Sequence, residues 1–153
     1  MRSRYEVLLL LAFAACLCAV QVAAAVMLAP GMPIPVITLA DQHDVKASVG
    51  PETRMVIFAR DMDAADIVEK ALDGDGAALL LDAGALFVSD IAGMPGMIRK
   101  LVAVPAMRKR PYRILLDRDG IATANMPVEK GKVTVLHLDA LKINAVEYVG
   151  SAE

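Results

Sequence analysis

MVIFARDMDAADIVEKAL, residues 55–72, places a uniformly apolar segment just before a segment with helical periodicity. Residues 55–59 are typical of a parallel strand that is covered on both faces, and we place this strand at the centre of a sheet. Asp63 can cap the following helix, and apolar residues recur at helical spacing from Ile67 to Leu72. A buried strand followed by an amphipathic helix predicts an α/β domain.

The segments after residue 72 continue this alternation. Residues 77–83 predict a short second helix that Gly84 closes, and residues 86–91 predict another strand. A third helix opens at residues 93–96 and is broken or restarted by Pro105. The apolar side chains that we expect this helix to turn inward are Met97, Ile98, Leu101, Val102 and Val104.

The last third of the chain is dominated by strands. Residues 112–116 predict a strand that an acidic turn follows, and residues 121–126 form a short helix or an extended piece. Residues 132–139 and 142–149 predict a terminal hairpin, because the second arm alternates with period two as an edge strand does.

The segment before residue 55 predicts a strand and a turn. Residues 29–35 are proline-rich and cannot be helical, residues 36–39 favour a strand, and residues 41–44 favour a turn. No internal repeat, low-complexity tract or linker follows Pro35. We therefore expect one domain over residues 30–150.

The first 25 residues have the pattern of an export signal. Arg2 and Arg4 precede an apolar run at residues 7–20, and small residues lead to Ala25, after which we expect cleavage. An uncleaved anchor is the alternative, because the apolar stretch is about long enough to cross a bilayer. We expect a periplasmic protein or, if the leader stays, a protein anchored in the inner membrane that faces the periplasm.

Both cysteines, Cys16 and Cys18, lie inside this leader. A lipid anchor at Cys16 is disfavoured, because the preceding residues match a lipoprotein box only distantly and apolar residues follow. Cleavage after Ala25 leaves no cysteine, which excludes disulfides, thiolate nucleophiles and cysteine metal ligands. The net charge of −2 argues against nucleic-acid binding, which needs a strongly basic face.

Two motifs and the order of the elements resemble the thioredoxin-like superfamily, in its peroxiredoxin-like and cytochrome-maturation branch. Residues 35–44, PVITLADQHD, are similar to its opening P-x-x-x-L-x-D-Q-H-G. Residues 135–143, VLHLDALKI, are similar to F-L-I-D-x-D-G-K-I of its closing hairpin. The resemblance covers most of residues 33–150 and implies an α/β fold: a central mixed β-sheet flanked by helices, with a C-terminal β-hairpin, preceded by the signal helix.

The resemblance also implies a redox site whose hallmarks are missing here. In the family, catalytic cysteines begin the helix after the strand equivalent to residues 55–59, where the helix dipole lowers the thiol pKa. Met62 and Ala65 fall near the two cysteine positions, and residues 131–133 replace the family's cis-proline segment. We therefore expect neither a thiol-disulfide oxidoreductase nor a cysteine peroxidase, and no catalytic residue carries over.

The altered corner is the candidate binding site of a non-redox accessory module, with an envelope protein or a small ligand as its partner and no cofactor. Its residues are Arg60, Asp61, Met62, Asp63, Gly131 and Lys132. Simple capping of the helix by Asp61, Asp63 and Asp66 is the favoured structural alternative. A membrane is a partner only if the leader is uncleaved.

An oxidoreductase with flavin or copper on the same scaffold is the alternative function. Soft thioether ligands select cuprous ion, and Met62, Met94, Met97 and Met107 raise this possibility. The spacing of Met94 and Met97 is equally that of core residues, and methionine is a common gap filler. Copper is therefore the less favoured interpretation.

Two further sets of residues have simpler structural interpretations. His43 is expected in a solvated turn and His137 half-buried on a strand, so the two are not expected to meet over a metal. One basic cluster is either a solvated face or a contact for an anion, a lipid headgroup or a partner. It comprises Arg99, Lys100, Arg108, Lys109, Arg110 and Arg113.

Overall fold

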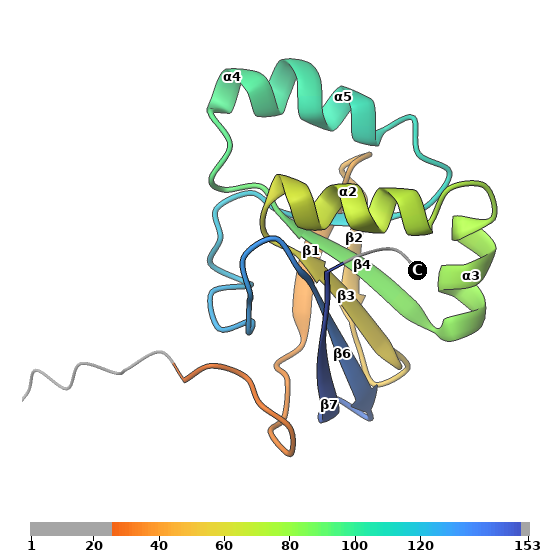
Figure 1. Cartoon of the computed structure of the whole chain (residues 1–153), viewed down its shortest axis with the longest axis vertical. Helices are drawn as coiled ribbons and strands as arrows, with labels where there is room; N and C mark the ends of the chain where they lie inside the picture. The colour runs from red at the N-terminus through yellow and green to blue at the C-terminus, as the bar shows by residue number, and fades with distance from the viewer. Residues whose placement is uncertain (1–25, 151–153) are drawn as a thin grey trace, which may run out of the picture.

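Within residues 26–150, which the computed structural model describes, seven strands form one mixed sheet in the order β2-β1-β5-β4-β3-β6-β7 (Figure 1). The strands β3, β4 and β5 are parallel, whereas β6 and β1 pair antiparallel with the two sides of this parallel centre. Two hairpins, β1–β2 and β6–β7, complete the sheet. The strands are β1 (Ile37–Asp41), β2 (Lys46–Val49), β3 (Met55–Ala59), β4 (Ala85–Asp90), β5 (Ile114–Asp117), β6 (Val133–Asp139) and β7 (Lys142–Val149).

The helices follow β3 and β4, as expected. Their bounds are α2 (Met62–Ala71), α3 (Gly76–Ala83), α4 (Gly96–Ile98), the π-helical turn η1 (Arg99–Ala103) and α5 (Val104–Met107). The last three run without interruption, and we call them helix 96–107. Pro105 lacks an amide proton and cannot complete the α-helical hydrogen bonding, which accounts for the wider turn just before it.

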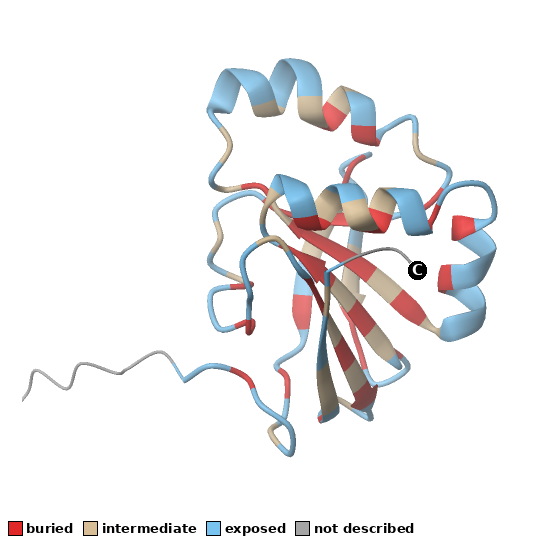
Figure 2. Ribbon diagram, in the orientation of Figure 1, coloured by how far each residue is buried: buried red, intermediate tan, exposed pale blue. Residues whose placement is uncertain are grey.

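The core divides into two clusters, one on each face of the sheet. The helices pack on one face, where Val68 of α2 and Leu80 of α3 join Phe87 and Ile114 of the strands. The opposite cluster contains no helical residue. It includes the strand residues Val56, Phe58, Val88 and Leu115, covered by Leu28 and Ile34 of the lead-in and by Met126. The strand β3 therefore contributes side chains to both clusters, as its uniform apolarity predicts. Each of its residues is buried or intermediate (Figure 2).

Helix α2 begins two residues earlier than it would with Asp63 as its cap. Asp61 is the N-cap residue, and its side chain accepts a 2.9 Å hydrogen bond from the Ala64 amide. Asp63 lies in the first turn instead, so the assignment of Asp63 as the cap is wrong. The predicted closure of α3 is confirmed, because Gly84 follows it in the left-handed conformation with φ 60°.

The burial predicted for helix 96–107 is wrong for four of the five apolar side chains. Only Val104 is buried, with Met107 beside it in the core. A π turn holds one residue more than an α turn, so the apolar positions before it and after it do not stay on one face. The four side chains that remain in water are Met97 (75% exposed), Ile98 (51%), Leu101 (64%) and Val102 (61%).

Three smaller predictions also need correction. The strand after the Pro111 turn begins at Ile114 rather than at residue 112. Residues 121–126 form turns that bury Met126, and they contain neither a helix nor a strand. The strand β2 was not expected.

Among the described residues, no helix has the length and apolar character needed to span a membrane, and the predicted signal segment lies outside these residues.

Candidate functional site

Asp61 joins the start of α2 to the loop before β6. Its Oδ1 accepts the Ala64 amide, and its Oδ2 accepts the Gly131 amide, each at 2.9 Å. These two hydrogen bonds hold the pKa of Asp61 below its usual value, and the bond from the Ala64 amide has the larger effect. Burial of the carboxyl acts in the opposite direction. Gly131 has φ 72°, which a glycine adopts without strain. Both carboxylate oxygens therefore bind the chain's own backbone.

Arg60, at the end of β3, has three partners nearby. Its Nε lies 3.2 Å from Asp90 Oδ2, and its Nη2 donates to the Thr123 carbonyl at 2.9 Å. The guanidinium carbon also lies 5.6 Å from the centre of the Phe58 ring, within cation–π range. Arg60 thus connects the ends of β3 and β4 with the loop after β5, and its charge is paired.

A hollow of about 250 Å³ opens between these groups. It lies at the carboxyl ends of β3 and β4, beside the first turn of α2, where open α/β sheets commonly bind ligands. Polar and apolar groups share its wall, and buried Ser89 contributes from β4. The lining residues are Arg60, Asp61, Met62, Ala65, Ser89, Asp90, Gly93 and Met94.

The structure brings part of the predicted site together. Arg60, Asp61 and Met62 line the hollow, and Gly131 is attached to it through Asp61. Asp63 is exposed and does not line the hollow. It is nevertheless close to Gly131, because a Cβ atom added to Gly131 would lie 3.8 Å from the Asp63 carboxylate. Lys132 instead pairs with Glu129 at 2.6 Å. Residues 26–150 contain neither a cysteine nor a cis peptide bond.

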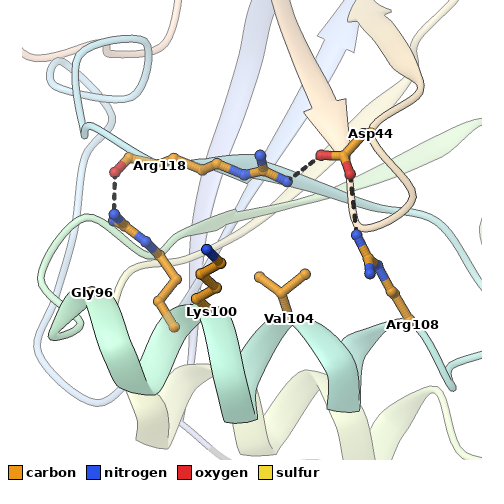
Figure 3. Close-up of a pocket in the computed structure, with 7 residues that line it drawn as sticks. Asp44, Gly96, Lys100, Val104, Arg108 and Arg118 are labelled. Atoms are coloured by element: carbon orange, nitrogen blue, oxygen red, sulfur yellow. Dashed lines mark hydrogen bonds and ion pairs between the residues drawn. The ribbon is translucent and has the colours of Figure 1, made fainter.

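A second cavity, of about 480 Å³, lies between helix 96–107 and the tip of the β1–β2 hairpin (Figure 3). Asp44 Oδ2 lies 3.1 Å from Arg108, and Asp44 Oδ1 lies 2.7 Å from Arg118. The hydrogen bond from Arg118 is the largest cause that lowers the pKa of Asp44. The residues that line the cavity are Asp44, Gly96, Arg99, Lys100, Val104, Arg108 and Arg118.

The basic cluster of the sequence divides in space. Arg99, Lys100 and Arg108 line this second cavity, whereas Arg110 pairs with Glu69. Of the remaining two residues, Arg113 pairs with Asp41 at 3.3 Å and Lys109 is exposed. Sequence reasoning missed Arg118 and Asp44 as members of the cavity. Their only signal was charge in turns, and they are 74 positions apart.

Of the residues considered as metal ligands, only Met62 and Met94 line the same hollow in the described part of the chain. Across residues 26–150, no three histidine, cysteine or acidic side chains are grouped so that they could hold a metal. His43 is exposed in the turn after β1, while His137 Nε2 lies 3.2 Å from Glu147 on the neighbouring strand. Of the methionines proposed as copper ligands, Met62 and Met94 line the hollow, Met97 is exposed and Met107 is in the core.

An apolar groove of about 460 Å³ runs between α2 and the terminal hairpin. Side chains of Ile67 and Leu72 form its helix side, and Val135 and Tyr148 form its strand side. It contains none of the predicted site residues.

Three solved structures with thioredoxin-like folds match most of this chain. A putative thiol:disulfide interchange protein DsbE from Chlorobium tepidum matches with a TM-score of 0.55 and 13% identity, over 81% of this chain and 87% of that chain. A thio-disulfide isomerase from Thermus thermophilus matches with a TM-score of 0.53 and 18% identity, over 80% of this chain and 87% of that chain. Peroxidoxin BcpB from Mycobacterium tuberculosis matches with a TM-score of 0.52 and 20% identity, over 79% and 86%.

The chain therefore has a thioredoxin-like fold, which confirms the fold expected from the sequence. No family model matches the chain, and no curated protein matches it. At these identities the likeness is one of fold.

Proposed function

We propose that this protein is an exported thioredoxin-like module without redox activity, which binds a partner in the bacterial envelope. The observation that carries the proposal is the bridge from Asp61 to Gly131. In a thiol enzyme of this fold, the start of the corresponding helix stabilises a thiolate. Here the start of α2 is occupied by the chain's own carboxylate. The resemblance implies that Met62 corresponds to a cysteine position.

The electrostatics of the corner also oppose a thiolate. A negative sulfur near residue 62 would lie between Asp61 and Asp63, and like charges raise a thiol's pKa. Arg60 offers little compensation, because it is paired with Asp90 at 3.2 Å. The corner thus supports binding of a neutral or basic group better than thiol chemistry.

The size of the hollow favours a protein partner over an enclosed cofactor. Ligand pockets usually enclose about 300 to 1,000 Å³, and the hollow beside Met62 is about 250 Å³. This volume suits one side chain of a partner that rests on the surrounding surface. Met62 itself is 60% exposed and is available for such contact.

The leader supports export. Arg2 and Arg4, the apolar run and the small residues before Ala25 are the features that secretion machinery uses. Intact mass of the protein from the envelope fraction tests this part, with loss of residues 1–25 as the expected result. A mass that still includes Met1 would contradict cleavage and favour an anchored protein.

The binding role is tested by capture from envelope extract, followed by comparison of two variants. Met62→Lys adds a positive charge inside the hollow, which opposes a neutral or basic group, and is expected to abolish capture of the partner. Val36→Lys is the control, because Val36 is 59% exposed and outside the hollow. Equal loss in both variants, or no loss in either, would contradict the corner as the binding site.

A cuprous site is the second candidate, supported by the two thioethers of Met62 and Met94 that line one hollow. Titration against a chromophoric Cu(I) chelator tests it, with Met94→Leu as the disabling variant and Met97→Leu as the control. Competition that depends on Met94 and not on Met97 would support copper. No competition by the parent protein would exclude this candidate.

A further inference from the structure

Helix 96–107 presents an apolar surface to water over its first two turns. Neither α4 nor η1 contains a buried residue, and the helix reaches the core only at Val104 and Met107 (Figure 2). The four apolar side chains of this segment are each more than half exposed: Met97, Ile98, Leu101 and Val102. Grouped apolar side chains in water mark an interaction surface rather than a packing element.

Cations accompany this apolar segment. Arg99 and Lys100 lie within the same turns and line the second cavity, together with Arg108 and Arg118 (Figure 3). Asp44 is the single acidic residue among the lining side chains, so the cations outnumber it. Arg108 and Arg118 both pair with its carboxylate, so three of the four positive charges are not balanced by an acidic side chain of the lining.

A helix that combines exposed apolar side chains with lysine and arginine matches the surface of an anionic bilayer. Such helices lie in the plane of the interface, with their apolar side chains in the acyl boundary and their cations at the headgroups. Each cation near an anionic surface strengthens binding by roughly five-fold. A protein partner would need acidic groups placed beside an apolar patch. An anionic bilayer has negative headgroups above apolar acyl chains at every point of its surface.

We propose that helix 96–107 docks on the surface of an anionic phospholipid bilayer. Met97, Ile98, Leu101 and Val102 enter the interface, and the cavity lined by Lys100 and Arg118 receives a lipid phosphate. This surface shares no lining residue with the hollow at Asp61, so the proposal does not depend on binding at that corner.

Sedimentation with vesicles tests the docking, with protein purified from the envelope and its N-terminus established by intact mass. Vesicles of phosphatidylglycerol and phosphatidylcholine are compared with vesicles of phosphatidylcholine alone. We expect binding to the anionic vesicles that weakens as salt is raised. Leu101→Asp is expected to weaken it at least ten-fold, and Lys100→Glu about five-fold or more.

Two matched variants separate docking from general changes in polarity or charge. Leu81 is 80% exposed on α3, so Leu81→Asp makes the same change on another helix. Lys142 is exposed on β7, so Lys142→Glu makes the same charge reversal away from helix 96–107. Both are expected to bind the vesicles within about two-fold of the parent, and circular dichroism confirms that all four variants fold.

Three results would overturn the proposal. The first is vesicle binding that Leu101→Asp and Lys100→Glu leave unchanged, which would place the contact elsewhere. The second is thermal stabilisation by inorganic phosphate without vesicle binding, which would show that the cavity takes a free anion. The third is a dimer in light scattering that Leu101→Asp dissociates, which would show that a second copy covers the helix.

Discussion

Asp61 and Gly131 are 70 positions apart in the sequence, and the Gly131 amide donates a 2.9 Å hydrogen bond to the Asp61 carboxylate. The same carboxylate caps α2 through the Ala64 amide. One side chain therefore fixes both the start of the helix and the loop before β6. In the resemblance drawn from the sequence, these two segments correspond to the start of the cysteine-bearing helix and to the cis-proline segment.

Replacement of Asp61 by alanine removes the cap and the bridge together. We expect Asp61→Ala to lower the free energy of unfolding by about 1–3 kcal/mol, measured by urea titration. Asp63→Ala is the control, because Asp63 is exposed in the first turn and is expected to change stability by less than about 0.5 kcal/mol. A larger effect for Asp63 than for Asp61 would show that the cap is misassigned.

Gln42 connects the first turn with the segment that leads into β5. It is buried, its Nε2 donates to the Tyr112 carbonyl at 2.7 Å, and its Oε1 accepts the Ile114 amide at 2.8 Å. Gln42→Ala leaves two buried backbone groups without partners and is expected to cost about 2–4 kcal/mol of unfolding free energy. The neighbouring exposed His43 provides the control, since His43→Ala is expected to be nearly neutral.

Asp117 gives the fold a defined response to acid. Burial opposes ionisation of this carboxyl most strongly. The hydrogen bonds from the Thr123 hydroxyl and amide, from the Asp119 side chain and from the Gly120 amide together outweigh burial and hold the pKa of Asp117 below its usual value. The folded state therefore binds this proton less readily than the unfolded chain does.

The stability that Asp117 contributes is complete above its unfolded pKa of about 3.9 and is lost as the pH falls through the lower folded value. Thr123→Val removes the hydroxyl that donates to Asp117 and raises the folded pKa. The pH-dependent part of the unfolding free energy below about pH 4 is then expected to shrink, as measured by urea titrations at several pH values. An acid response unchanged in Thr123→Val would contradict this role.

The parts of the fold that could be predicted have local signals. The strand–helix unit at residues 55–72 and the terminal hairpin show distinct periodicities, and their elements form almost where expected. The sequence offers three aspartates near the start of the helix, Asp61, Asp63 and Asp66, and the pattern alone does not distinguish them. In the structure Asp61 accepts the Ala64 amide as the cap, and the distant Gly131 amide holds its other oxygen.

The burial of helix 96–107 could not be predicted from periodicity. Apolar residues at helical spacing predict a buried face whether the partner is the core or another surface. The π turn before Pro105 then separates Leu101 from the positions of Val104 and Met107 that reach the core. The periodicity therefore predicted an amphipathic helix correctly. The prediction that its apolar side chains are buried in the core was wrong for the four side chains before Val104.

The second cavity was missed because its partners are far apart in the chain. Asp44 and Arg118 lie in separate turns, and only the pairing of β1 with β5 brings these turns together. Residues 114–117 form β5, and the turn that follows it carries Arg118.

Thiol-disulfide turnover is the most direct test of the account. The insulin reduction rate is compared for the parent protein without residues 1–25 and for its Met62→Cys/Ala65→Cys variant. We expect the parent to be indistinguishable from the uncatalysed reaction, while any turnover gained by the variant shows that the assay detects this scaffold. Turnover by the parent above the uncatalysed rate would contradict the assignment of a non-redox module.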